Sequence, residues 1–174
     1  MDANVVVAII TSGTVSALIS FYLTSRQEDK KLRQEKLEEL FIRLSQWIKS
    51  FSIYSLNFHH AMQGKLSLND VYDMMKNIST KDEKDNLNKI EMIIGVYFPT
   101  LQANYDDLMS CRKTTNEVII EFEKTAKSGK VYKNIFDQKL DTETDKLDII
   151  EPEFKKAIFR EANALFKPWW KFWH

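Results

Sequence analysis

A long stretch without charge near the N-terminus constrains the fold more than any other feature. No Asp, Glu, Lys or Arg occurs between Asp2 and Arg26, and the mean hydropathy of residues 5–23 is roughly 2, which is typical of transmembrane helices. At 1.5 Å per residue, a helix over residues 4–25 is about 33 Å long, enough to cross a hydrocarbon core of about 30 Å. We therefore predict a single transmembrane helix over residues 4–25.

Three other interpretations of this stretch compete with a transmembrane helix. A cleaved signal peptide has basic residues before its apolar run and a small-residue cleavage site, whereas this chain begins Met-Asp-Ala and has no A-x-A pattern. A helix buried in a soluble core is usually shorter. An amphipathic surface helix fits poorly, because the stretch has no charged face.

The residues on either side of the stretch predict its orientation. No Lys or Arg precedes it, and a group of basic residues follows it: Arg26, Lys30, Lys31, Arg33 and Lys36. By the positive-inside rule, we expect the N-terminus outside and residues 26–174 in the cytoplasm. The only Cys in the chain, Cys111, excludes a disulfide framework and agrees with a reducing compartment.

Small residues recur along one side of the predicted span. They stand every four residues, with a Gly-x-x-x-Ala pair beside them: Ala8, Ser12, Ser16 and Ser20, then Gly13 and Ala17. Such spacing lets two helices approach closely, and it is also common in transmembrane helices in general. The pattern predicts self-association in the membrane, and hence a homo-oligomer, against the alternative that it has no special role.

The rest of the chain has the apolar periodicity of helices, and no segment shows the alternation of a strand. One pattern runs from the charged stalk, residues 26–39, to Gly64, a natural helix stop. Further helices are predicted over 67–77, where Ser67 and Asp70 have capping-box spacing, over 80–98 and over 100–127. The predicted fold class is all-α: a transmembrane helix that continues into a cytoplasmic antiparallel bundle of about four helices, residues 26–174.

An acidic stretch comes before the last predicted helix. Residues 137–153 contain seven carboxylates and two lysines, so we interpret them as a solvated linker. The last helix is expected to begin at Pro152, because proline favours the first turn, and to end at Pro168.

The C-terminal tail, residues 167–174, is rich in tryptophan. We predict that it contacts the membrane interface through Trp169, Trp170, Lys171, Phe172 and Trp173. Trp favours the headgroup region and Lys favours anionic lipid. Two alternatives are that the Trp rings fill gaps in the bundle core and that they dock a protein partner.

The sequence shows no constellation of residues that would support catalysis. His59 and His60 are adjacent, so on a helix they point about 100° apart and do not easily share a metal. His174 and Cys111 have no nearby chemical partner in sequence, and the glycines are too scattered for a phosphate-binding loop. We expect no catalytic residue, cofactor or metal ligand. Because the formal net charge is zero, we expect no direct binding of nucleic acid.

The most distinctive local segments are Ile93-Ile94-Gly95-Val96-Tyr97-Phe98-Pro99 and the Trp-rich end. Together with the anchor, stalk and helical bundle, they give an architecture similar to the transmembrane effector proteins of bacterial retron anti-phage systems. The resemblance implies a place at the bacterial inner membrane and a partner complex, a reverse transcriptase ribonucleoprotein, that keeps the effector silent. Once released, such effectors damage the host membrane and abort the infection.

We therefore expect a non-enzymatic, single-pass membrane protein with the lipid bilayer as a partner. The first hypothesis is an abortive-infection effector that self-associates and perturbs the inner leaflet. The second is a membrane-tethered scaffold or regulator that recruits a cytoplasmic protein. A third, a phage lysis-type protein, would need a periplasmic domain.

Overall fold

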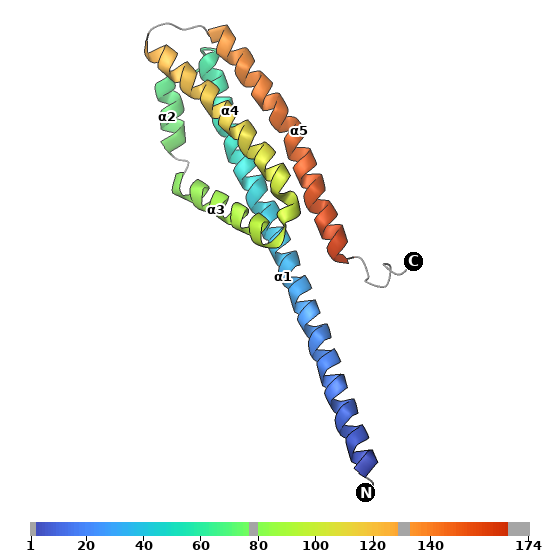
Figure 1. The fold of residues 1–174 in the computed structure, drawn as a ribbon. Helices are drawn as coiled ribbons and strands as arrows, with labels where there is room; N and C mark the ends of the chain where they lie inside the picture. The colour runs from blue at the N-terminus through green and yellow to red at the C-terminus, as the bar shows by residue number, and fades with distance from the viewer. Residues whose placement is uncertain (1–2, 77–79, 129–132, 167–174) are drawn as a thin grey trace. The chain divides into compact units, whose positions relative to one another are not determined.

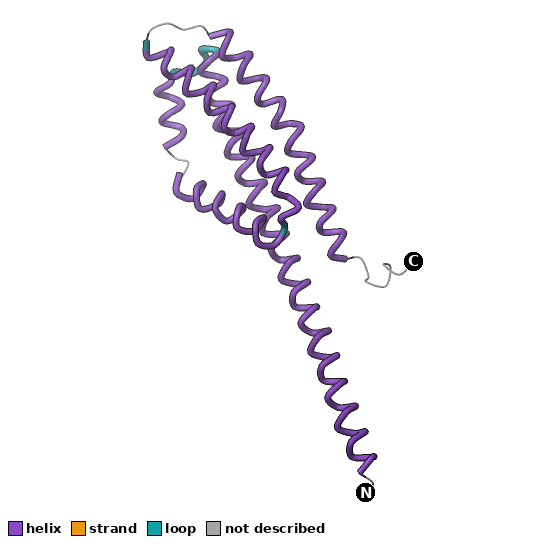
Figure 2. The backbone as a smooth tube through the Cα atoms, in the orientation of Figure 1, coloured by secondary structure: helices purple, strands orange, loops and turns teal. Residues whose placement is uncertain are grey.

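The computed structural model describes the backbone of residues 3–76, 80–128 and 133–166, and every element in these ranges is helical. The elements in chain order are α1 (Ala3–Met62), α2 (Leu68–Lys76), α3 (Thr80–Tyr97), the short 3₁₀ helix η1 (Pro99–Leu101), α4 (Gln102–Lys127) and α5 (Lys133–Phe166) (Figures 1 and 2). The prediction of an all-helical chain is confirmed for this part of the sequence.

The chain divides into two compact units, residues 1–36 and 37–174. In the first unit the backbone is helical from Ala3, and the described side chains, residues 20–36, are almost all exposed. The guanidinium of Arg26 lies 5.0 Å from the ring centroid of Tyr22, a cation–π contact on the helix surface. Residues 26–36 of the predicted stalk, residues 26–39, are exposed or partly exposed, and Leu37 is buried.

No helix among the described residues is long and apolar enough to cross a membrane. The side chains of residues 3–19 are outside the described part, and most of the predicted span, residues 4–25, falls there.

The second unit is a helical bundle with two apolar clusters. The larger cluster joins α1 between Leu37 and Phe51 to α3, to the first half of α4 and to the second half of α5. The smaller cluster joins the end of α1, around Phe58 and Met62, to α2, to the second half of α4 and to the start of α5. The core therefore continues along the bundle.

Ring contacts establish the directions of the long helices. Phe41 near the start of the bundle part of α1 lies 5.7 Å from Phe159 near the end of α5, so these helices are antiparallel. Phe122, late in α4, lies 5.8 Å from Phe136, early in α5, which makes that pair antiparallel too (Figure 1). The short helices α2 and α3 together lead back from the smaller cluster to the larger one. The bundle thus has four successive passes, and the second is split into α2 and α3.

Local signals in the sequence explain the first loop. Gly64, the second residue after the end of α1, has a positive φ of 75°, a conformation that glycine adopts without strain. The Ser67 amide donates to Asp70 Oδ2 at 3.0 Å, and the Asp70 amide donates to Ser67 Oγ at 3.2 Å. This reciprocal pair is a capping box that begins α2, as predicted. The Ser67 hydroxyl, which donates to Asp70 Oδ2 at 2.7 Å, and the Ser67 amide hold the pKa of the Asp70 carboxyl below its ordinary value.

The prediction for residues 137–153 was wrong. This acidic stretch is part of α5, which continues through Pro152. Buried side chains follow a helical spacing along it: Phe136, Leu140, Leu147, Phe154 and Ile158. Pro152 is exposed, so the carbonyl that its missing N–H leaves unpaired is on the solvent side, where water can bond it. Burial of one apolar face outweighs the cost of the proline.

Candidate functional site

The predicted membrane-contact residues lie almost entirely outside the described part of the structure. Of the small-residue stripe, only Ser20 has a described side chain, and it is exposed. The side chains of Ala8, Ser12, Gly13, Ser16 and Ala17 are outside the described residues. The whole tail, with Trp169, Trp170, Lys171, Phe172 and Trp173, is also outside them.

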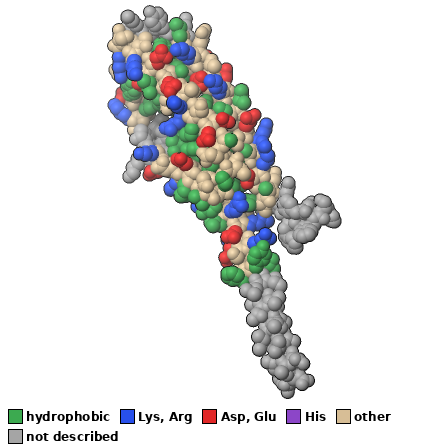
Figure 3. Space-filling view, viewed as in Figure 1, with side chains coloured by type: hydrophobic (Ala, Val, Ile, Leu, Met, Phe, Trp, Pro, Cys, Tyr) green, Lys and Arg blue, Asp and Glu red, His purple; other side chains and the backbone are tan. Residues whose placement is uncertain are grey.

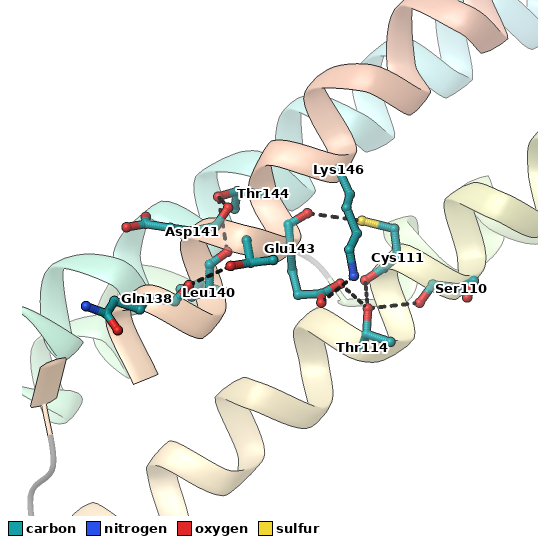
Figure 4. A network of polar contacts seen from close by, with 10 residues as sticks. Ser110, Cys111, Thr114, Gln138, Leu140, Asp141, Glu143, Thr144 and Lys146 are labelled. Atoms are coloured by element: carbon teal, nitrogen blue, oxygen red, sulfur yellow. Dashed lines mark hydrogen bonds and ion pairs between the residues drawn. The ribbon is translucent and has the colours of Figure 1, made fainter. Parts of the chain in front are cut away.

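Cys111 is a buried core residue that helps to join α4 and α5. Its thiol donates to the backbone carbonyl of Glu143 at 3.4 Å (Figure 4). Burial raises the pKa of the Cys111 thiol, so the reactive thiolate is scarce at neutral pH. Burial and this hydrogen bond make Cys111 a structural residue of the core.

The Glu143 side chain completes this network on the α4 side of α5. Its carboxylate accepts hydrogen bonds from Thr114 Oγ1 at 2.5 Å and from Lys146 Nζ at 2.6 Å (Figure 4). Burial raises the pKa of the Glu143 carboxyl, but the bonds from Lys146 and Thr114 lower it by more than burial raises it. The pKa is therefore below its ordinary value. Each polar group of this network has a partner, which is the pattern of a structural cross-link.

A second cluster of titratable groups lies on the other side of α5, against α1. His59 Nδ1 is 3.4 Å from Asp137 Oδ1 and 3.2 Å from Asp141 Oδ1. The three ligand-type atoms all lie within 4.8 Å of one another. Asp137 and Asp141 are four residues apart on α5, so they share one face of that helix. The other ring nitrogen of His59, Nε2, is 2.6 Å from Gln63 Nε2.

A surface hollow of about 370 Å³ adjoins this cluster. Residues of α1 and α5 line it: Ser52, Ser55, Leu56, His59, Asp141, Thr144, Leu147 and Asp148. Ser55 is only 1% exposed, and its hydroxyl has no hydrogen-bond partner among the described residues. A buried hydroxyl with unused bonding capacity therefore lines the hollow.

Sequence reasoning missed this cluster. His59 has no ligand-type partner at helical spacing on its own helix, and its two carboxylate neighbours were assigned to a linker. The helical spacing of Phe136, Leu140 and Leu147 is the signal that could have placed the carboxylates on a helix facing α1. Their distance to His59 is decided only by tertiary packing.

No family model matches the chain, and neither a curated protein nor a solved structure matches it.

Proposed function

We propose that this protein is a non-enzymatic, single-pass protein of the bacterial inner membrane that acts as an effector in anti-phage defence by abortive infection. One observation carries the proposal: the uncharged, apolar residues 4–25 are followed directly by Arg26, Lys30, Lys31, Arg33 and Lys36. That order favours a spanning helix with the bundle on the cytoplasmic side.

The backbone of α1 supports the anchor part of the proposal. It is helical from Ala3 to Met62, and only a helix satisfies every backbone hydrogen bond of a single span within the segment. The resemblance to retron effectors, which is at the level of architecture, adds the defence role. The small-residue stripe and the Trp-rich tail would then supply self-association and contact with the inner leaflet.

Membrane insertion is tested by placing a charge in the middle of the stretch. Val15→Arg costs roughly 2.5–3.5 kcal/mol at the centre of a spanning helix, whereas Val15→Leu is tolerated. We expect the arginine variant to be lost from the membrane fraction of bacterial host cells and the leucine variant to remain there. An arginine variant that stays in the carbonate-washed membrane as the wild type does would contradict the anchor.

The effector role is tested by controlled expression with a membrane-potential dye. We expect depolarisation and growth arrest with the wild type and neither with Val15→Arg. The gene neighbourhood is a second test, because a retron effector is expected beside a reverse transcriptase. Absence of depolarisation under phage infection would count against the effector role.

A second candidate, a membrane-tethered scaffold that recruits a cytoplasmic protein, is favoured by apolar side chains exposed on the bundle. The largest exposed fractions there are 66% for Val96, 63% for Ile149 and 56% for Phe159. Figure 3 shows apolar side chains scattered among acidic and basic ones on the visible face. Replacing Val96 by Asp should abolish recruitment by a scaffold and leave the depolarisation of an effector unchanged.

A further inference from the structure

The cluster of His59, Asp137 and Asp141 between α1 and α5 is not explained by hydrogen bonding within the protein. A single ring nitrogen carries at most one hydrogen, yet two carboxylate oxygens approach His59 Nδ1 at 3.4 and 3.2 Å. Asp137 Oδ1 is shielded from solvent and has no hydrogen-bond partner among the described residues. A buried carboxylate oxygen without a hydrogen-bond partner is costly, and a cation at this position would offset that cost.

Charge repulsion strengthens this conclusion. Asp137 and Asp141 are one turn apart on the same face of α5, and like charges at that spacing destabilise a helix. Both carboxylates pair with His59, whereas Lys139, the basic residue between them in sequence, pairs with Glu121 of α4. A bound cation would remove the repulsion.

The two distances from His59 Nδ1 to the carboxylate oxygens suit a small transition-metal ion. Two ligand atoms that each lie about 2.0–2.1 Å from a tetrahedral Zn²⁺ are about 3.3–3.4 Å apart. The two separations at His59 Nδ1 are close to this value. A set of one imidazole nitrogen and two carboxylate oxygens is suited to Zn²⁺ and its first-row neighbours, whereas Mg²⁺ and Ca²⁺ prefer oxygen ligands alone.

The residues around the cluster include a partner for the second ring nitrogen of His59 and a hollow for a further ligand. Gln63 Nε2 lies 2.6 Å from His59 Nε2, and reversing this amide would place its oxygen there, to accept the Nε2 hydrogen when Nδ1 presents its lone pair to a metal. The adjoining hollow leaves room for a fourth ligand such as water. Its wall includes Ser55, whose buried hydroxyl has no partner among the described residues and stands one turn before His59 on α1.

We propose that His59, Asp137 and Asp141 bind one divalent transition-metal ion, with Zn²⁺ as the best fit, and that the ion clamps the end of α1 to the start of α5. The proposal is independent of the membrane role, because it concerns only the bundle. The metal ion would link α1 to α5, two helices that are far apart in sequence.

The test is metal binding by the purified full-length chain, stripped with a chelator and carrying an affinity tag without histidine. Titration with Zn²⁺ should give one ion per chain. Co²⁺ should give the visible absorption of a four-coordinate site with nitrogen and oxygen ligands, and Mg²⁺ and Ca²⁺ should not compete. We expect the Tm to rise when Zn²⁺ is added and to return to its metal-free value when the chelator is added.

Variants locate the site. His59→Gln and Asp141→Asn should each weaken Zn²⁺ binding by about 100-fold or more, and Gln63→Ala by roughly 10-fold, as for loss of a partner that orients a ligand. The matched controls are His60→Gln, the adjacent histidine, and Asp148→Asn, an acidic residue of the same hollow. Asp141 has 55% of its side chain exposed, so its substitution is expected to leave the fold intact. Circular dichroism of the metal-free variants checks this.

Three results would overturn the proposal. One is that neither Zn²⁺ nor Co²⁺ forms a 1:1 complex with the chain. Another is equal weakening by His60→Gln and His59→Gln, which would place the ion elsewhere. The third is unchanged binding in Asp141→Asn. None of these results depends on membrane insertion or on depolarisation, so the clamp and the effector role can fail separately.

Discussion

Helix α5 presents carboxylates to α4 on one side and to α1 on the other, and the two sides satisfy them differently. Toward α4, Glu143 accepts hydrogen bonds from Thr114 and Lys146. Toward α1, Asp137 and Asp141 share one nitrogen of His59, and Asp137 Oδ1 has no hydrogen bond among the described residues. The bonds within the protein account for the Glu143 carboxylate, whereas the unpartnered Asp137 oxygen is the basis of the proposed metal site.

The largest change would disturb both sides of α5 together. Phe154 is fully buried in the larger apolar cluster, and Phe154→Ala should lower the free energy of unfolding by about 3–5 kcal/mol through the cavity that it leaves. The measurement is urea unfolding followed by circular dichroism. Phe159→Ala is the control, because that ring is 56% exposed and contacts Phe41 at its edge of the bundle. Equal losses from the two variants would contradict the assignment of Phe154 to the core.

Breaking the α4 side alone should cost less. Glu143→Gln removes the charge from the bonds with Lys146 and Thr114, and we expect a loss of about 1–2 kcal/mol in the free energy of unfolding. Glu153→Gln, an exposed position on the same helix, should change it by no more than about 0.5 kcal/mol. If the two variants unfold alike, the network does not join the helices energetically.

The same network predicts a pH dependence. The pKa of Glu143 is lowered in the folded state from an ordinary value near 4.5, chiefly because the bonds from Lys146 and Thr114 outweigh the effect of burial. The folded state therefore favours the ionised carboxylate. The stabilisation is complete above pH 4.5 and is lost as the pH falls through the lowered pKa. The difference in Tm between wild type and Glu143→Gln should shrink below pH 4.5, and a constant difference would argue against this origin.

On the α1 side the corresponding substitution should have the smallest effect, with the opposite sign. In the presence of a chelator, Asp141→Asn removes repulsion from Asp137. We expect the free energy of unfolding to rise by about 0.2–0.5 kcal/mol. With Zn²⁺ present the order should reverse, since only the wild type gains from binding. A clear loss of stability without metal would mean that the His59 contact is structural.

Much of the bundle could be predicted because the signals are local. The end of α1 at Met62 follows from Gly64, and the start of α2 follows from the pairing of Ser67 with Asp70. Each signal acts through backbone conformation or through a hydrogen bond within one turn. The neighbouring residues in sequence are therefore sufficient to predict its effect.

The start of α5 could not be predicted in the same way. The high charge of this helix is typical of linkers, and Pro152, in its second half, is typical of the first turn of a helix. The apolar residues that hold it, from Phe136 to Ile158, gain their energy only when α1 and α4 are beside them. The candidate metal site depends on the same packing, since it joins His59 to residues of α5.

The sequence by itself determined the helical class, the first loop and the separation of an uncharged stretch from a charged, periodic remainder. These follow from charge, hydropathy and capping, which operate over a few residues. Only the tertiary structure decided that the acidic stretch is a helix and that two of its carboxylates face His59. The physical reason is that burial and ligand geometry depend on distances between residues that the chain order leaves far apart.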